Sequence, residues 1–310
     1  MFTSQDETGF LRNTEMENHL QKAAVLVEAL PYIRKYHGKT VVMKYGGSAM
    51  LSEEIKTHVM NDIILMYLVG MHPIIVHGGG PDIHQMLKKM EVPTKFVNGL
   101  RVTDPATMQV VEMVLFGKLN PEIANNLNIM GGHAISLSGK SSNLLFAKKK
   151  LTTVQGEDGR ETPCDLGLVG EVESVNVLLL QSLIAQGYIP VISPIGIGEN
   201  GETYNINADD VAGKVAAALS AEKLILLTDV EGVYSNYADK NTMISHMTLS
   251  EAQSLLDKKI IDGGMIPKIQ CCIDAIHGGV SAAHILDGRQ PHSIILELLT
   301  KEGIGTMIEG

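Results

Sequence analysis

Apolar and polar positions follow two alternating patterns over most of the chain. Short, nearly continuous apolar runs predict buried strands, and the segments between them carry apolar residues three and four positions apart, which is typical of amphipathic helices. Strands are expected at residues 40–44, 74–77, 134–137, 144–147, 169–174, 189–195, 223–228, 283–286 and 306–308. Helices are expected after Ser52 and Pro81 and at residues 177–186, 209–219, 249–258, 266–277 and 291–299. Strand–helix–strand units of this length are parallel and right-handed. The pattern therefore predicts an α/β fold with one continuous, mainly parallel sheet in two lobes.

An amphipathic helix is expected ahead of the first strand. Residues 14–17 (Thr-Glu-Met-Glu) have the form of a capping box, and apolar residues recur at helical spacing from Leu20 to Leu30. Pro31 is expected to kink this helix, and Gly38 to end it. The apolar side of the helix needs a partner, which is either its own domain or another subunit. The predicted divisions are a flexible tail at 1–13, a helix at 14–38, and a single domain at 39–310 with lobes at about 39–195 and 196–310.

Composition narrows the class of protein. Of the 310 residues, 45% are hydrophobic and 19% charged, which is enough apolar material for a core. The formal net charge of −10 argues against nucleic-acid binding, which needs a basic face. No segment reads as a signal peptide or membrane span, and the three cysteines lack the spacing of a disulfide framework. We therefore expect a cytoplasmic protein with buried thiols that binds neither nucleic acid nor membrane.

Two glycine-rich turns follow the first two predicted strands. In Lys44-Tyr45-Gly46-Gly47-Ser48, a lysine ends the strand, and Gly46, Gly47 and Ser48 offer backbone N–H groups to phosphate oxygens. The second turn, residues 77–81 (His-Gly-Gly-Gly-Pro), runs into a helix N-terminus, which also attracts anions. Because the carboxyl ends of parallel strands meet at one edge, both turns are expected at the same ligand site. His77 is expected to be a hydrogen-bonding residue at the strand end rather than a base or metal ligand.

Polar groups that could bind a carboxylate occur further along the chain. Arg101 lies in a turn-rich segment where its guanidinium could form a fork with a carboxylate, although a surface ion pair is the alternative. Asn205, Asn207 and Asp209 fall on one side of an extended segment where a helix begins. One asparagine would suffice as a cap, so three polar groups facing one way indicate a binding site.

The second half of the chain carries a candidate nucleotide edge. The buried-looking strand ending at Thr228 is followed by a polar bend, a natural place for a nucleotide. The candidate nucleotide residues in this bend are Thr228, Asp229, Gly232 and Tyr234. Lys268 lies in the first turn of a helix, where positive charge is unfavourable, so it is expected to be held there for an anion.

Two other motifs match nucleotide signatures only in their letters. Residues 196–201 (Gly-Ile-Gly-Glu-Asn-Gly) follow a strand, but residues 199–202 have the signature of a hairpin turn, and an extended segment rather than a helix is expected at 203–206. Residues 139–141 (Gly-Lys-Ser) lack the first glycine of a Walker A loop, because Ala134 stands at that position. We therefore expect neither a nicotinamide-binding Rossmann unit nor a P-loop.

Taken in order, these segments resemble the amino acid kinase family. The segments that carry the resemblance are KYGG at 44–47, HGGGP at 77–81, NGLRVT at 98–103, NINAD at 205–209, LLTDVEGVY at 226–234 and GGMIPK at 263–268. The resemblance implies a three-layer αβα sandwich with a mainly parallel open central sheet over nearly the whole chain. It points to the members that transfer a phosphoryl group from ATP to the side-chain carboxylate of N-acetyl-L-glutamate in arginine biosynthesis. Mg²⁺ would be carried by the ATP phosphates and not by the protein.

The resemblance also implies roles for individual residues. Lys44 and Lys268 would stabilise the transferring phosphoryl group, and Asp209 would orient both lysines. The substrate-binding residues would be Gly79, Gly80, Arg101, Asn205 and Asn207.

Regulation is implied in the same way. The N-terminal helix and the C-terminal segments are similar to those of arginine-inhibited members, in which the helix joins dimers into a hexameric ring, a trimer of dimers. The candidate contacts for L-arginine are Tyr32, His284, Glu297, Gly303 and Gly305. The PII signal protein is a further candidate partner, because some relatives in photosynthetic organisms bind it.

Other functions on the same fold stay open at this point. A carbamate, aspartate, glutamate or uridylate kinase would share the phosphate loops, although the NGLRVT and NINAD segments favour the acetylated amino acid. A non-catalytic sensor of arginine or nucleotide is the alternative from another class. Loss of Lys44, Lys268 or Asp209 would indicate a sensor, and all three residues are present.

Overall fold

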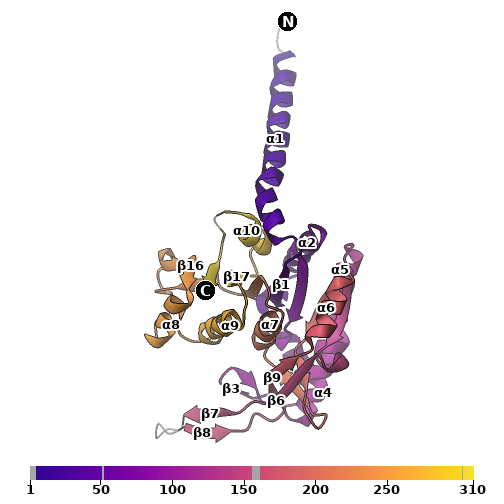
Figure 1. Ribbon diagram of the computed structural model, residues 1–310, viewed down its shortest axis with the longest axis vertical. Helices are drawn as coiled ribbons and strands as arrows, with labels where there is room; N and C mark the ends of the chain where they lie inside the picture. Colours follow the sequence, from indigo (N-terminus) through magenta and orange to yellow (C-terminus); the bar gives the residue numbers. More distant parts are fainter. Residues whose placement is uncertain (1–4, 51, 156–160, 302) are drawn as a thin grey trace.

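A computed structural model describes residues 5–50, 52–155, 161–301 and 303–310 (Figure 1). Its α-helices are α1 Gln5–Tyr36, α2 Glu53–Leu68, α3 Gly80–Lys89, α4 Pro105–Val114, α5 Asn120–Ile129, α6 Val177–Ala185, α7 Ala208–Ala218, α8 Leu249–Asp257, α9 Met265–His277 and α10 Ser293–Leu299. Short helical turns are η1 Gly47–Met50, η2 Leu115–Leu119 (a π-helix), η3 Ser141–Asn143 and η4 Lys240–Thr242.

The main sheet runs through the centre of the molecule. Its strands are β16 His246–Thr248, β18 Thr306–Glu309, β17 Ala282–Asp287, β13 Lys223–Thr228, β1 Thr40–Tyr45, β2 His72–His77, β10 Ile189–Ser193 and β5 Ala134–Ser138, in that spatial order. All neighbours pair in parallel except β17 and β18, which are antiparallel. The predicted mainly parallel sheet is therefore confirmed.

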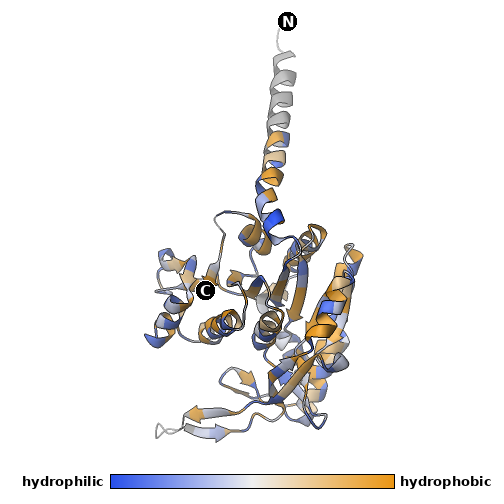
Figure 2. Cartoon of the chain, viewed as in Figure 1, coloured by the Kyte–Doolittle hydropathy of each residue, from blue (hydrophilic) through white to orange (hydrophobic). Residues whose placement is uncertain are grey.

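Helices cover both faces of this sheet. Alternate residues of the strands point to opposite sides, so Val42 packs with one set of helices and Met43 with the other. The first core contains residues of α6, α7, α8 and α9, and the second contains residues of α2, α5 and α10. Figure 2 shows the central strands coloured as hydrophobic between these layers. The three-layer α/β/α arrangement is the one expected.

A separate small sheet corrects the expectation of one continuous sheet. Its strands are β6 Leu145–Lys149, β9 Val169–Val175, β11 Ile195–Ile197 and β12 Thr203–Ile206, which close on one another and do not join the main sheet. The apolar run 189–195 is split between the two sheets at Pro194, which has no N–H to continue a ladder. Strands β11 and β12 form an antiparallel hairpin around the turn predicted at residues 199–202.

Short two-stranded ribbons complete the fold. They are β3 Phe96–Val97 with β4 Leu100–Arg101, β7 Thr152–Gln155 with β8 Glu161–Cys164, and β14 Val233–Tyr234 with β15 Met243–Ile244. In Figure 1 the β7–β8 ribbon extends from the body at the end opposite α1.

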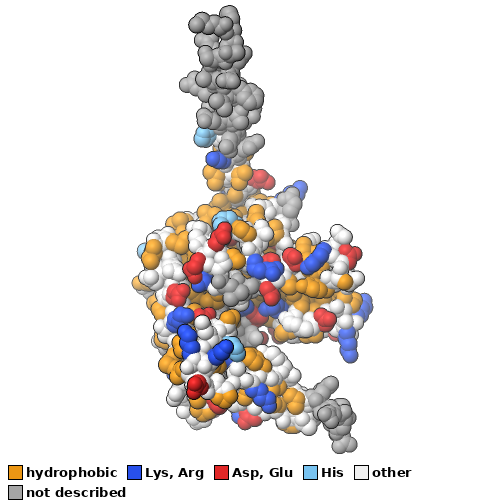
Figure 3. All heavy atoms as spheres, turned by 180° about the vertical axis from the view of Figure 1, so that it is seen from behind, with side chains coloured by type: hydrophobic (Ala, Val, Ile, Leu, Met, Phe, Trp, Pro, Cys, Tyr) orange, Lys and Arg blue, Asp and Glu red, His pale blue; other side chains and the backbone are white. Residues whose placement is uncertain are grey.

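The N-terminal helix differs from the prediction in two ways. It already begins at Gln5, so residues 14–17 lie inside it, and their side chains are outside the described part of the chain. Between Leu20 and Leu30 the apolar side chains are exposed, and α1 stands away from the body (Figures 1 and 3). Packing on its own domain is therefore wrong for this stretch; only the end of α1, with Tyr36, enters the second core. No helix of the described residues is long and apolar enough to cross a membrane.

Candidate active site

The two glycine turns lie against each other at the carboxyl ends of β1 and β2, which pair in parallel with Tyr45 opposite His77. The Gly78 N–H donates to the Tyr45 carbonyl oxygen across 2.7 Å. A Cβ at Gly46 would lie 3.1 Å from the Gly78 nitrogen, so the turns are close because Gly46 has no side chain. The prediction that the two turns lie at the same edge of the sheet is therefore confirmed.

Asp209 lies between two lysines from different elements. Its Oδ1 is 3.3 Å from the Lys44 Nζ at the end of β1, and its Oδ2 is 2.6 Å from the Lys268 Nζ on α9. None of the three side chains exposes more than 16% of its surface. Two cations and one anion therefore leave a net positive charge in a nearly dry place, which suits a bound phosphoryl group.

Burial and charge act against each other in this cluster. Burial lowers the pKa of Lys44 below its usual 10.5, while the attraction of Asp209 opposes the shift. Burial would raise the pKa of Asp209, but Lys44 and Lys268 outweigh it and hold that pKa below 3.8. Asp209 is therefore ionised at neutral pH.

Helix caps explain how Asp209 and Lys268 come to face each other. The Asn207 Oδ1 accepts hydrogen bonds from the backbone N–H groups of Asp209 and Asp210, at 2.7 and 3.3 Å, and so starts α7. Helix α9 packs beside α7, and Lys268 lies in its first turn. A lysine there is unfavourable for the helix dipole, and the Asp209 carboxylate offsets the cost.

A first cavity of about 300 Å³ opens over the glycine turns. Its walls include Lys44, Gly47, Gly78, Gly79, Gly80, Arg101, Asn205, Asn207 and Asp209. All the predicted substrate-binding residues line this one cavity. It draws residues from both sides of the predicted lobe boundary near residue 195.

Arg101 is buried in the wall of this cavity rather than on the surface. Its guanidinium donates to the Thr94 Oγ1 across 2.6 Å and to the Gly80 carbonyl across 3.2 Å, and it stacks on the Phe96 ring at 4.6 Å. Burial lowers the pKa of its guanidinium, although an arginine stays cationic at neutral pH. The surface ion pair left open by the sequence is therefore wrong. Its neighbour Asn205 donates to the Thr103 Oγ1 at 3.2 Å.

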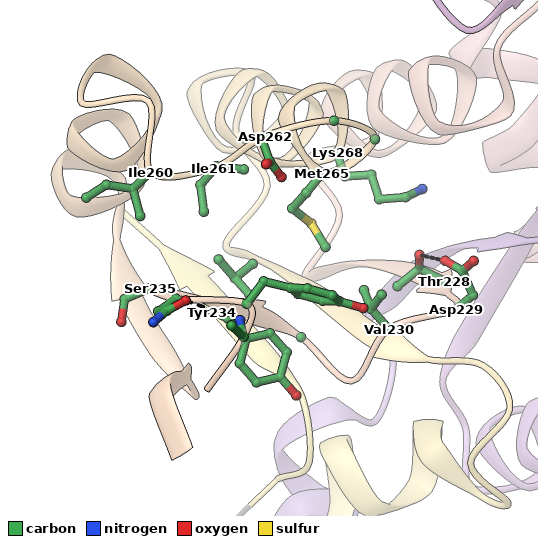
Figure 4. A pocket seen from close by; sticks show the side chains of 17 residues that line it. Thr228, Asp229, Val230, Tyr234, Ser235, Ile260, Ile261, Asp262, Met265 and Lys268 are labelled. Atoms are coloured by element: carbon green, nitrogen blue, oxygen red, sulfur yellow. Dashed lines mark hydrogen bonds between the residues drawn. The ribbon is translucent and has the colours of Figure 1, made fainter. Parts of the chain in front are cut away.

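A second cavity, of about 600 Å³, has Lys268 in its wall. Predicted nucleotide residues in its walls are Thr228, Asp229, Gly232 and Tyr234. Figure 4 shows Lys268, Thr228 and Asp229 at one end of the cavity and Ile260, Ile261 and Ser235 at the other. The cavity thus has a charged end next to Asp209 and a more apolar end away from it.

The remaining predicted nucleotide residues lie elsewhere. Gly47 is in the wall of the first cavity, and Gly46 packs against Gly78. The backbone of Ser48 is in η1, while its side chain lies outside the described part.

The residues predicted to contact arginine form a second polar cluster, near the C-terminus. The buried carboxylate of Glu297 accepts from the His284 ring across 2.6 Å and from the backbone N–H groups of Ile304 and Gly305 at 2.7 and 3.0 Å. A Cβ at Gly303 would lie 2.8 Å from the Glu297 Oε2. Tyr32, at the end of α1, is half-buried on the second core, which includes α10. Burial lowers the pKa of His284, and hydrogen bonds, chiefly from His284, lower that of Glu297 against the effect of burial.

Several residues that shape the site were not predicted. Thr94 and Phe96 hold Arg101, and Asn120 holds His77 through a contact of 3.0 Å. Asn120 lies in the helical stretch 105–129, which was not among the predicted helices. A polar residue amid the apolar positions of that stretch is the signal that could have found it.

The described residues hold no group of three or more His, Cys, Asp or Glu side chains arranged for a metal ion. Every cationic group at the centre of the site is a lysine or arginine.

The family model described as "Amino acid kinase family" matches residues 39–287, which include both cavities and all three charged residues between them. The chain belongs to the amino acid kinase family.

Curated relatives extend this match to nearly the full chain. A protein of Pelotomaculum thermopropionicum named acetylglutamate kinase is 55% identical over 294 residues, covering 95% of this chain and 100% of that protein. Another of the same name, from Caldanaerobacter subterraneus subsp. tengcongensis, is 54% identical over 298 residues and 96% of both chains.

Solved structures share the fold. An N-acetylglutamate synthase from Neisseria gonorrhoeae, complexed with coenzyme A and N-acetyl-glutamate, has a TM-score of 0.79 and 26% identity over 93% of this chain. This chain spans 63% of that longer protein. A second structure of the synthase, complexed with coenzyme A and L-arginine, has a TM-score of 0.71 and also 26% identity; the match covers 93% of this chain and 65% of that one.

Proposed function

We propose that this chain transfers the γ-phosphoryl group of ATP to the side-chain carboxylate of N-acetyl-L-glutamate, forming an acyl phosphate. The observation that carries the proposal is the ion pairing of Lys44 and Lys268 through Asp209, because Lys44 and Asp209 line the first cavity and Lys268 lines the second. Relatives named acetylglutamate kinase at 54–55% identity support the choice of acceptor.

The first cavity suits the acceptor. A side-chain carboxylate has a pKa near ~4.3 and is already ionised at pH 7, so the nucleophile needs no general base. The cavity offers Arg101 as a cation for a carboxylate, the N–H groups of Gly79 and Gly80 as neutral donors, and the amide of Asn205 as a polar contact.

The second cavity suits the nucleotide. Its apolar end, with Ile260 and Ile261, can hold a base, and its charged end brings the phosphates to Lys268. Mg²⁺ would enter on the ATP phosphates and neutralise part of their charge when bound. The residues that support this route are Lys44 and Lys268, whose positive charges can bind phosphate oxygens that the metal leaves unpaired.

The reaction brings two anions, the acceptor carboxylate and the ATP phosphates, close together. Positive groups at fixed positions reduce the electrostatic repulsion between them. Lys44, Lys268 and the N–H groups of Gly79 and Gly80 are held in place before substrate arrives, so they need little reorganisation when charge develops. Asp209 keeps both ammonium groups directed at the junction. Its own carboxylate is paired on both oxygens and is not a base in this proposal.

The direct test is an assay of the purified chain with Mg-ATP and N-acetyl-L-glutamate, in which hydroxylamine traps the acyl phosphate as a hydroxamate. Glutamate, aspartate and carbamate are run in parallel. Hydroxamate that depends on the acetyl group supports the proposal. Product only with another acceptor would assign the chain to another kinase, and no product with any acceptor would favour a sensor.

We also propose that L-arginine inhibits the reaction by binding near Glu297. The geometry that supports this is a buried carboxylate that already accepts N–H groups from the segment 304–305 and lies beside the base of α1. The arginine complex of the related synthase supports it as well. The same hydroxamate assay with millimolar L-arginine tests it, since unchanged product formation would remove the proposal without affecting the kinase assignment.

A homo-oligomer, with the trimer of dimers as the first candidate, is proposed on the exposed apolar residues of α1. These are Leu20, Val25, Leu26, Val27 and Leu30, which expose 50–72% of their surface. Light scattering on the full chain and on Leu26→Glu tests it. A mass that is the same for both chains would contradict a role for this helix.

A further inference from the structure

His77 stands between the sheet and the glycine turn and is completely buried. Its Nδ1 lies 2.8 Å from the carbonyl oxygen of Gly78, and its Nε2 lies 3.0 Å from the Nδ2 of Asn120. Both ring nitrogens therefore have a partner, and neither faces the reacting groups.

Asn120 decides which ring nitrogen carries the proton. Its Nδ2 also lies 2.9 Å from the Val191 carbonyl and 3.3 Å from the Leu137 carbonyl, so this atom must be the amide nitrogen. Its oxygen accepts from the Ser136 hydroxyl. Because an amide NH₂ only donates, the Nε2 facing it is unprotonated, and the proton is on Nδ1. Burial lowers the pKa of His77 to about 4, which keeps the ring neutral at neutral pH.

The Nδ1–H of His77 then fixes the orientation of one peptide plane. The Gly78 carbonyl and the Gly79 N–H belong to a single trans peptide and point in opposite directions. With the carbonyl held on the buried ring, the Gly79 N–H points away from it, toward the cavity that Gly78, Gly79 and Gly80 line. Within the described part of the chain this N–H donates to no other group.

Side-chain packing also restricts the glycine turn at residues 78–80. A Cβ at Gly79 would lie 2.6 Å from both the Leu115 Cδ2 and the Leu119 Cδ1, which belong to the π-helix η2. Asn120 follows directly on η2, so one irregular segment packs on Gly79 and also bonds to His77. π-Helical turns are frequent at functional sites.

We propose that His77, held in one tautomer by Asn120, is a positioning residue that directs the Gly79 N–H at the anionic acceptor. The identity of that acceptor rests on the proposed function. The ring does not touch the substrate; it supplies a donor orientation that is fixed before binding, which is worth most when negative charge develops.

Two amide variants separate this role from simple filling of the core. In His77→Asn the amide nitrogen can take the place of Nδ1 and still donate to Gly78. In His77→Gln the amide reaches the position of Nε2, so the contact with Asn120 is kept and the donor to Gly78 is lost. We expect His77→Gln to lower kcat/KM for N-acetyl-L-glutamate by about 10–100-fold, as expected for a misplaced donor, with KM for ATP unchanged. His77→Asn should retain most of the wild-type value.

Thermal unfolding of both variants accompanies the kinetics. Equal losses in two folded variants, or no loss in His77→Gln, would overturn the proposal. If His77→Gln does not fold, a folded but inactive His77→Asn overturns it, and an active one supports it.

A spectroscopic measurement tests the tautomer of His77 without any acceptor substrate. In the full wild-type chain with ¹⁵N-labelled histidine, the buried ring should show a protonated Nδ1 and an unprotonated Nε2 at neutral pH. The opposite tautomer would overturn the positioning role even in an active kinase. Conversely, a chain that shows the expected tautomer but no product with N-acetyl-L-glutamate would refute the proposed function and leave the orientation of the peptide intact.

Discussion

Asp209 and Lys268 are 59 positions apart in the sequence, yet the carboxylate Oδ2 and the ammonium nitrogen lie 2.6 Å from each other across two helices. The second oxygen of the same carboxylate pairs with Lys44 on the central sheet. One acid therefore controls the direction of two cations that come from different layers. This arrangement makes the cluster sensitive to changes at Asp209 in a way that a pair of surface lysines would not be.

Asp209→Asn should reduce kcat by about 10²-fold, comparable with the loss of one fixed electrostatic contact. An amide cannot neutralise either lysine, so the two ammonium groups repel each other and lose their common direction. Steady-state kinetics with both substrates measures the change. Asp210→Asn is the matched control, because the next carboxylate on α7 pairs with Lys150 at 3.0 Å instead. Equal kcat in the two variants would contradict the role of Asp209.

Lys44→Ala and Lys268→Ala should each reduce turnover by about 10²–10³-fold if each removes one contact made in the transition state. The exposed Lys214, on the same helix as Asp209, provides a control substitution to alanine. Single-turnover measurement of acyl phosphate distinguishes a slow chemical step from slow product release. Near-normal turnover in both variants would rule out these lysines as phosphoryl contacts.

Arg101→Lys should raise KM for N-acetyl-L-glutamate while leaving KM for ATP near its original value. A planar fork that donates to Thr94 and Gly80 and stacks on Phe96 is replaced by a point charge on a flexible stem. Initial rates over a range of each substrate give the two constants. An unchanged KM for the acceptor would show that Arg101 is not its carboxylate contact.

The rate should fall on the alkaline side at a pH below 10.5, because burial lowers the pKa of Lys44 and its charge is needed in the reaction. The sign follows from protonation: as pH rises through the lowered pKa, Lys44 becomes neutral and stops attracting the phosphoryl oxygens. The pH dependence of kcat/KM reports groups of the free enzyme. In Lys44→Arg, whose guanidinium has a pKa above ~12, this fall should move to higher pH. An alkaline limb at the same position in both proteins would assign it to another group.

Gly46→Ala should separate the two glycine turns, since the added methyl would lie 3.1 Å from the Gly78 nitrogen and 3.2 Å from its Cα. We expect kcat/KM to fall by about tenfold or more, because a small displacement of substrate-positioning groups is costly. Gly117→Ala is the control, because among the described residues no atom outside the adjoining backbone of its own helix lies within 4 Å of the added Cβ. Equal effects of the two substitutions would show that the contact between the turns is unimportant.

Much of this site could be predicted because it depends on local rules. Strand ends of a parallel sheet meet at one edge, so the turns after β1 and β2 had to be neighbours. Asn207 and Asp209 occur where a helix begins, and the geometry of a cap places them on the same side as Asn205.

The parts that were missed depend on contacts distant in sequence. Pro194 splits an apolar run between two sheets, and only the presence of the small sheet shows where its second half belongs. Asn120 is held by hydrogen bonds to carbonyl oxygens of β5 and β10. The spacing of apolar residues along the chain does not predict these contacts. The apolar pattern of α1 likewise leaves two partners open, its own domain or another subunit, and only its position relative to the body excludes the first between Leu20 and Leu30.

The placement of β1 has a consequence for how the chain acquires its activity. This strand sits between β2, which follows it closely, and β13, whose residues 223–228 are far along the chain. During synthesis β1 and β2 can pair early, but one edge of β1 stays open until β13 emerges, and an open edge of an apolar strand invites pairing with other chains. Lys44 meets its partners only when that gap closes and α7 and α9 dock. Such long-range pairing is slow, so the charged centre can assemble only after the chain has been made as far as Lys268.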